Sequence, residues 1–138
     1  MTSNRQAFTL FEALLGLFIF GMILLMTLRL PVTGWQDQIR SRLFFDQLAQ
    51  SLEGHQQVAI NKRESQPVLF DAQRGLVAFP EEDLWLPPDW HLGASFIFTY
   101  LPNGRVTNFR TVTFFHEQGM VIKLVFQLGS GKFEFQTP

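Results

Sequence analysis

The hydrophobic pattern of the chain begins with one long apolar run near its start. From Phe8 to Leu28 the residues are apolar apart from two threonines and a single carboxylate, Glu12. As a helix rising about 1.5 Å per residue, this run would reach about 31 Å, the thickness of the hydrocarbon core of a bilayer. The pattern predicts one membrane-spanning helix over residues 8–31. A charge inside such a helix costs roughly 1–3 kcal/mol, so Glu12 requires a partner.

A second, amphipathic pattern follows the apolar run. Arg29 ends the run, and Pro31 predicts a bend or local unwinding because proline lacks the N–H that a helix needs. After Pro31, apolar residues recur mostly every four or five positions, with polar residues between them. This spacing predicts a helical continuation over residues 32–62 that ends near Asn61 and buries one apolar face. Gly54 weakens the helical pattern by roughly 1 kcal/mol relative to alanine, which allows a kink or an end near it. The residues predicted on the buried face are Trp35, Ile39, Leu43, Leu48, Leu52 and Ala59.

Residues 63–138 alternate between apolar and polar positions as β-strands do. A hairpin is predicted where two apolar stretches flank a turn with Gly75 at its exit. Residues 80–90 contain two consecutive prolines and are predicted to form a loop or crossover held by Trp85 and Trp90. We expect one antiparallel meander that uses the amphipathic helix as its lid, which makes the chain α+β. The predicted strands are 68–70, 76–79, 96–100, 110–116, 120–128 and 132–136.

Composition narrows the classes of function that remain. The 138 residues leave room for one small head of about 100 residues after a membrane helix. The formal net charge of −1 gives no global field that would attract nucleic acid. The chain has no cysteine, which excludes disulfides, thiolate nucleophiles and zinc sites built on sulfur. The head must therefore be stabilised by packing alone.

No arrangement of residues predicts catalysis. His55, His91 and His116 are isolated, and none has the second histidine four residues away that a zinc protease helix uses. Gly129 and Gly131 join two strands, whereas a phosphate-binding loop joins a strand to a helix. We expect no enzyme activity, no metal and no cofactor.

The start of the chain indicates whether the apolar run is a signal peptide, a plain anchor or a segment that follows a cleaved leader. An ordinary secretory signal peptide or a plain single-span anchor is the commoner case for an apolar N-terminus. Here the run is longer than the roughly 7–15 residues of a signal core, and no Ala-x-Ala site follows it. Residues 1–7 form a short polar leader with Arg5 as its charge, and it stops at a small residue, Ala7. The sequence is therefore suited to cleavage in front of the apolar run.

At these residues the chain resembles the type IV prepilin family, whose members carry a short leader, Phe-Thr-Leu-x-Glu and an unbroken apolar helix. The resemblance implies cleavage by a prepilin peptidase between Ala7 and Phe8 and N-methylation of Phe8. Ala7 stands where the family usually has glycine. Glu12 becomes the fifth mature residue, and a carboxylate there would gain by pairing with the new amino terminus of a neighbouring subunit in a low dielectric. The implied fold is pilin-like, with the long helix packed on a small antiparallel sheet.

Over most of its length, the long N-terminal helix included, the chain resembles the competence minor pseudopilins of the ComGD type. The residues that carry this likeness are Phe96 and Phe98 before the Asn103-Gly104 turn, and the stretch 127–133 near the end. The resemblance implies a structural subunit of a DNA-uptake filament, held in the cell membrane by one span with its head outside and later incorporated at the cell surface. Implied partners are other pseudopilins, the peptidase, the assembly platform and its ATPase.

Two alternatives stay open: a minor pseudopilin of a type II secretion system, and a plain membrane-anchored binding protein. Binding to DNA would require basic residues of the sheet to converge on one face, where they could contact phosphates. Mixed charge around them is more typical of ordinary sheet surface, so we expect weak DNA binding at best. The four basic residues are Arg105, Arg110, Lys123 and Lys132.

Overall fold

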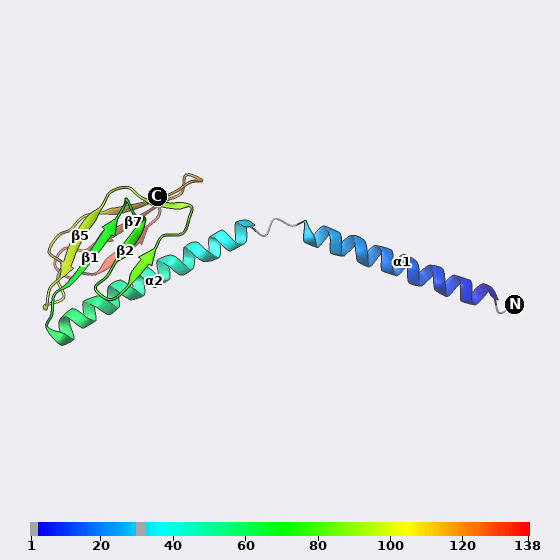
Figure 1. The fold of residues 1–138 in the computed structure, drawn as a ribbon, viewed down its shortest axis with the longest axis horizontal. Helices are drawn as coiled ribbons and strands as arrows, with labels where there is room; N and C mark the ends of the chain where they lie inside the picture. The colour runs from blue at the N-terminus through cyan, green and yellow to red at the C-terminus, as the bar shows by residue number, and fades with distance from the viewer. Residues whose placement is uncertain (1–2, 30–32) are drawn as a thin grey trace. The chain divides into compact units, whose positions relative to one another are not determined.

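The computed structural model describes residues 3–29 and 33–138, with the backbone alone for residues 3–8 and 33. Within this part, two helices precede two small antiparallel sheets (Figure 1), so the predicted α+β class is confirmed. The chain divides into two compact units, Met1–Asp37 and Gln38–Pro138, and each is described by itself. The bend predicted at Pro31 lies outside the described residues.

Helix α1 (Ser3–Leu28) begins ahead of the apolar run, so part of the predicted leader is also helical. The two threonines of the span Thr9–Leu28 lie at its opposite ends, and the Thr27 hydroxyl donates a 2.8 Å hydrogen bond to the Leu24 carbonyl. This bond satisfies the hydroxyl within the helix, as an apolar environment requires. At the end of α1, the Arg29 N–H donates to the Met26 carbonyl at 3.3 Å.

Helix α2 (Thr33–Lys62) ends one residue beyond the predicted Asn61. It runs through Gly54 without interruption, and a Cβ placed there would have no atom within 4 Å. The glycine is therefore tolerated on an open side of the helix and does not end it. The chain turns out of α2 at Arg63, which takes the left-handed conformation with φ of 53° that commonly follows a helix.

The predicted buried face of α2 is correct only in the second half of the helix. Leu48, Leu52 and Ala59 are fully buried, but Trp35, Ile39 and Leu43 are exposed. The position that continues the buried face toward the start of α2 is Phe44, four residues before Leu48. Successive residues turn by about 100°, so Leu43 and Phe44 lie on different sides of the helix. The prediction joined two separate apolar stripes into one face.

The first sheet has the strand order β3-β2-β1-β5 and confirms the predicted hairpin. Leu69 of β1 pairs with Ala78 of β2 on one side and with Ile97 of β5 on the other, both antiparallel. The alternation in β5 is confirmed, because Phe98 and Tyr100 are buried and Ile97 is exposed. The strands are β1 (Gln66–Asp71), β2 (Leu76–Ala78), β3 (Asp83–Trp85) and β5 (Phe96–Tyr100).

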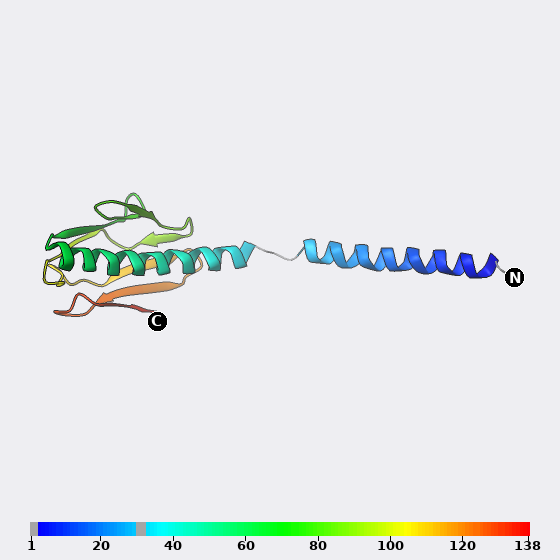
Figure 2. The ribbon, with the colours of Figure 1, turned by 90° about the horizontal axis from the view of Figure 1, so that it is seen from below.

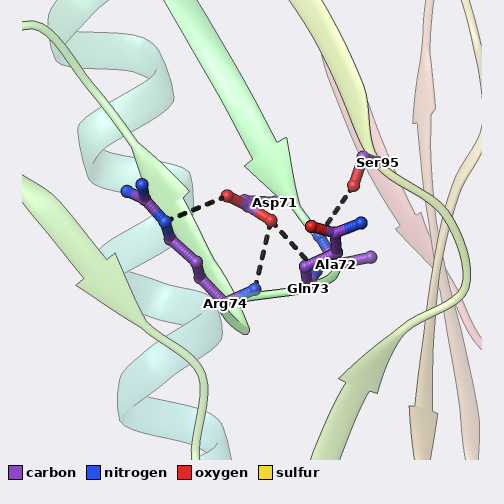
Figure 3. A network of polar contacts seen from close by, with 5 residues as sticks. All are labelled: Asp71, Ala72, Gln73, Arg74 and Ser95. Atoms are coloured by element: carbon purple, nitrogen blue, oxygen red, sulfur yellow. Dashed lines mark hydrogen bonds and ion pairs between the residues drawn. The ribbon is translucent and has the colours of Figure 1, made fainter.

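Asp71 closes the turn between β1 and β2 (Figure 3). One carboxylate oxygen accepts the N–H groups of Gln73 at 2.9 Å and Arg74 at 3.1 Å, and the other lies 3.7 Å from the Arg74 guanidinium. The Ser95 hydroxyl, at the start of the approach to β5, accepts the N–H of Ala72 at 3.0 Å. An aspartate that bonds the backbone two and three residues later is a standard way to fix a turn.

The second sheet has the order β4-β6-β7-β8, so the predicted single meander is wrong. The meander continues only through β6, β7 and β8. β5 pairs with β1 in the other sheet, and after a single bridge from Tyr100 to Val106 the chain crosses to β6. The alternating pattern along the strands is the same for either pairing, so it did not reveal the partner. The strands are β4 (Trp90–Leu92), β6 (Val112–His116), β7 (Val121–Phe126) and β8 (Phe133–Gln136).

The segment predicted as a loop over residues 80–90 contains short strands at both ends. β3 occupies Asp83–Trp85, and β4 begins at Trp90, whereas Pro87 and Pro88 are outside strands as predicted. Trp90 does hold the segment: it is buried, and its indole N–H donates to the Ser41 hydroxyl of α2 at 2.8 Å. Trp85 does not, since 63% of it is exposed.

Aromatic side chains join the two sheets to α2. Phe98 of the first sheet contacts Phe126 of the second, with ring centroids 4.8 Å apart. On the helix side, Phe45 packs edge to face against Trp90 at 5.0 Å and Phe135 at 5.5 Å. Figure 2 shows α2 passing across both sheets. The helix is therefore the lid that was predicted, although it covers two sheets instead of one.

Tyr100 has a buried hydroxyl for which the described residues offer no hydrogen-bond partner. Burial raises the pKa of this phenol, and the charge of Glu53 raises it further. An unsatisfied buried hydroxyl costs about 1–3 kcal/mol. We expect Tyr100→Phe to leave the head as stable as before or more stable, measured as urea unfolding of the full chain in detergent.

Because Tyr100 is the only tyrosine in the chain, its absorbance at alkaline pH reports on this one group. In the unfolded chain the phenol loses its proton near pH 10, while the folded head retains it. The contribution of Tyr100 to stability is therefore constant below about pH 10 and falls above it, by about 1.4 kcal/mol per pH unit. Tyrosinate absorbance should appear together with unfolding; ionisation of the folded head near pH 10 would contradict this.

Candidate functional site

The candidate site is the apolar surface of α1. The span Thr9–Leu28 is 20 residues long and apolar enough to cross a membrane, and none of it is buried. Its large side chains are about half to three-quarters exposed, and Phe11, Leu17 and Met26 are about two-thirds or more exposed. Apolar surface on this scale is stable in water only when something covers it. Its length and composition fit a lipid bilayer, so α1 is a helix that could serve as a single membrane span.

Glu12 is the one ionisable residue of this span. Its side chain is exposed on α1, and no ion pair among the described residues includes it. Thr9 and Gly16 lie three and four residues from Glu12, hence on the same side of the helix. A Cβ at Gly16 would have no atom within 4 Å, so the surface next to the carboxylate is open. A cationic group from another molecule could reach Glu12 from this side.

Ala7 and Phe8, between which cleavage was predicted, are part of helix α1. Their side chains are outside the described part of the structure. Processing at this bond therefore stays a prediction from the sequence.

The three histidines lie apart and each makes structural contacts. His55 of α2 is half-buried, stacks on Phe79 with centroids 4.7 Å apart, and has Nδ1 3.2 Å from the Gln66 amide oxygen. Its Nε2 lies 3.8 Å from the Glu82 carboxylate, which also accepts the Ser51 hydroxyl at 2.7 Å. These contacts attach α2 to β1 and to the loop before β3.

His91 and His116 belong to the second sheet. The exposed His91 lies 3.5 Å from the Glu117 carboxylate, and His116 packs edge to face on Trp90 at 5.0 Å. Across residues 3–29 and 33–138, as far as their side chains are described, no three histidine, aspartate or glutamate side chains group closely enough to hold a metal ion.

The four basic residues considered for DNA binding are all exposed. Lys132 lines a hollow between α2 and the start of β8, together with Glu53. Arg110 lines a different hollow, beside β6 and Phe96. Neither hollow includes Arg105 or Lys123. A shared phosphate-binding surface formed by the four is therefore not evident in these hollows, and DNA binding stays a prediction.

One polar residue with a clear structural role was missed in the sequence. The Gln56 amide donates from α2 to the Gly104 carbonyl at 2.8 Å and to the Ser130 carbonyl at 3.0 Å. It therefore links the turn after β5 in the first sheet to the turn between β7 and β8 in the second. The glycines of both turns were visible in the sequence, but nothing there showed that the turns meet.

Comparison of the chain with models of protein families, with curated protein sequences and with solved structures found no match.

Proposed function

We propose that the chain is a minor structural subunit of a type IV pilus-like filament, the competence pseudopilus that takes up transforming DNA. The observation that carries this proposal is an apolar helix, exposed along its length, that holds one carboxylate near its start. A plain anchor gains nothing from Glu12, which costs insertion free energy. A subunit that must recognise the end of its neighbour gains a charged contact from it.

In this proposal α1 serves in two environments. It first holds the subunit in the cell membrane as a single span, with the head outside. After cleavage by a prepilin peptidase, it leaves the bilayer and becomes part of the helical core of the filament at the cell surface. An exposed apolar surface suits both environments, because lipid tails and neighbouring apolar helices can each cover it.

The proposed partners follow from these steps. Other major and minor pseudopilins surround α1, while the assembly platform and its ATPase drive the transfer out of the membrane. The role is structural, so no catalysis and no cofactor is proposed for the head. Direct contact with DNA through the basic residues of the sheets is the weakest part of the proposal. A minor subunit of a type II secretion system would share the same anchor, processing and assembly contact.

The processing step gives the most direct test. In cells that contain the prepilin peptidase, we expect mass spectrometry of the mature chain to find a first residue of N-methylated Phe8. The same chain made without the peptidase should keep residues 1–7. Ala7→Gly, which introduces the residue usual in the resembled family, should be processed at least as completely as the parent. A chain that keeps its leader when the peptidase is present would identify it as a plain anchored protein.

A further inference from the structure

Helix α2 carries an apolar surface on which neither sheet packs. Trp35, Ile39 and Leu43 are spaced four residues apart and are 77%, 56% and 55% exposed. We call these three residues the α2 stripe. Residues spaced by four lie close together on one side of a helix, so the three side chains form a continuous apolar surface.

The α2 stripe faces away from the core of the head. At about 100° per residue, its centre lies about 180° from the side that carries Phe44, Leu48 and Leu52, which are buried. The sheets therefore cannot cover the stripe without a rotation of the whole helix. Further along the helix, this same side becomes polar: Asp46, Gln50, Glu53 and Gln57. The apolar surface is thus confined to the first three turns of α2.

These first turns are also the part of α2 nearest to the membrane span in the sequence. The span ends at Leu28, and Trp35 follows seven residues later. Seven residues of chain reach at most about 25 Å, even when fully extended. If α1 crosses a bilayer, the α2 stripe therefore begins within reach of the lipid headgroups. Tryptophan is enriched in this interfacial zone.

The charges beside the stripe indicate what covers it. Arg40 and Arg42 are exposed and lie on opposite sides of the stripe, about 100° and 60° from its centre. Two cationic flanks around an apolar stripe are typical of helices that lie on anionic lipid, where guanidinium groups contact phosphates. A second copy of the stripe would instead bring like-charged arginines together. The surface therefore fits lipid better than it fits itself.

We propose that the α2 stripe binds the anionic surface of the bilayer, with Trp35, Ile39 and Leu43 in the headgroup zone and Arg40 and Arg42 on lipid phosphates. This inference rests on the membrane anchoring in the proposed function but not on filament assembly. It adds a second membrane contact, which holds the start of α2 against the bilayer while the subunit is anchored.

The absence of native cysteine allows a clean test with single labelled cysteines in the full chain. Leu43→Cys and Gln38→Cys would each carry a nitroxide after reconstitution into vesicles of mixed anionic and zwitterionic lipid. Gln38 is exposed but lies off the stripe, and it is closer to the span than Leu43 is. Simple closeness to the anchor would therefore favour lipid contact at position 38, whereas our proposal favours it at position 43.

We expect the label at position 43 to be relaxed several-fold more by oxygen, which concentrates in lipid, than by a water-soluble nickel complex. The label at position 38 should show the reverse order. Arg40→Gln with Arg42→Gln, or purely zwitterionic vesicles, should return position 43 to the values of position 38. Two results would overturn the proposal. In the first, the nickel complex relaxes the label at position 43 more than oxygen does. In the second, both reagents relax this label less as the number of protein chains per vesicle rises. The second of these outcomes would identify another copy as the occupant.

Extraction of the same vesicles at alkaline pH separates this inference from the proposed function. A chain that stays in the membrane while position 43 is open to nickel retains its anchor and refutes only the lipid contact. A chain that is released from the membrane refutes the anchor, and both proposals with it.

Discussion

Glu12→Ala is expected to abolish incorporation of the subunit into filaments and to leave its membrane insertion intact. The physical reason is a charge pair that forms only between molecules. Cleavage before Phe8 creates a positive amino terminus, and at 4 Å from a carboxylate the attraction is about 4 kcal/mol for an effective dielectric of 20. In the span Thr9–Leu28 no other ionisable side chain could replace Glu12. Removing it should make insertion slightly easier, because the apolar run becomes uninterrupted.

The measurement compares filament fractions sheared from cells with membranes extracted at alkaline pH. Cells that lack the gene and carry the variant should also lose transformation, which tests the competence assignment in the same strain. Glu12→Gln keeps the shape of the side chain and removes its charge, so it should fail like alanine if the charge is what matters. Glu12→Asp keeps the charge and should retain part of the incorporation. Normal incorporation of the glutamine variant would refute the charge pair.

The helices show how far a hydrophobic pattern can be read. A run as long as Phe8–Leu28 has few alternatives to a helix, and α1 contains all of it. The end of α2 was also predicted to within one residue, because polar residues and Pro67 follow it. The error concerned which side of α2 is buried. Trp35 and Leu48 are both apolar, and only the angle between them, together with the position of the sheets, determines which one enters the core.

The sheets show where the pattern gives less information. Alternation identified β5 and its buried Phe98 and Tyr100, because a strand with one buried face must alternate. Alternation does not identify the neighbouring strand, however, and β5 pairs with β1, about 30 residues earlier, and not with β6. Similarly, the sequence indicated the acidic residue of the candidate site. It could not indicate that Gln56 connects turns of two different sheets.

The contact between those turns leads to the second large expected effect, at Gly131. Gly131 has φ of 69° and is buried, and a Cβ there would overlap the Gly104 carbonyl oxygen and come within 2.7 Å of the Gln56 amide nitrogen. Backbone oxygen cannot move aside as a flexible side chain can. An added methyl group must therefore separate the two turns that Gln56 joins, with loss of its bonds to Gly104 and Ser130.

We expect Gly131→Ala to destabilise the head by roughly 2–5 kcal/mol, the sum of a left-handed alanine and an overpacked contact. Gly129→Ala is the matched control. Gly129 lies in the same turn with φ of 82°, but a Cβ there would have no atom within 4 Å, so only the backbone term of about 1–2 kcal/mol applies. Urea unfolding of the full chain in detergent, followed by tryptophan fluorescence, measures both.

Combining Gly131→Ala with Gln56→Ala tests the cause of the loss. If the methyl group acts by separating the turns, Gly131→Ala has already broken the two hydrogen bonds of Gln56, and the second substitution should add little. The double variant should then be less destabilised than the sum of the single variants. Additive losses, or equal losses for Gly129→Ala and Gly131→Ala, would mean that backbone conformation alone sets the cost. Such a result would refute the inference that Gln56 links the two sheets through their turns.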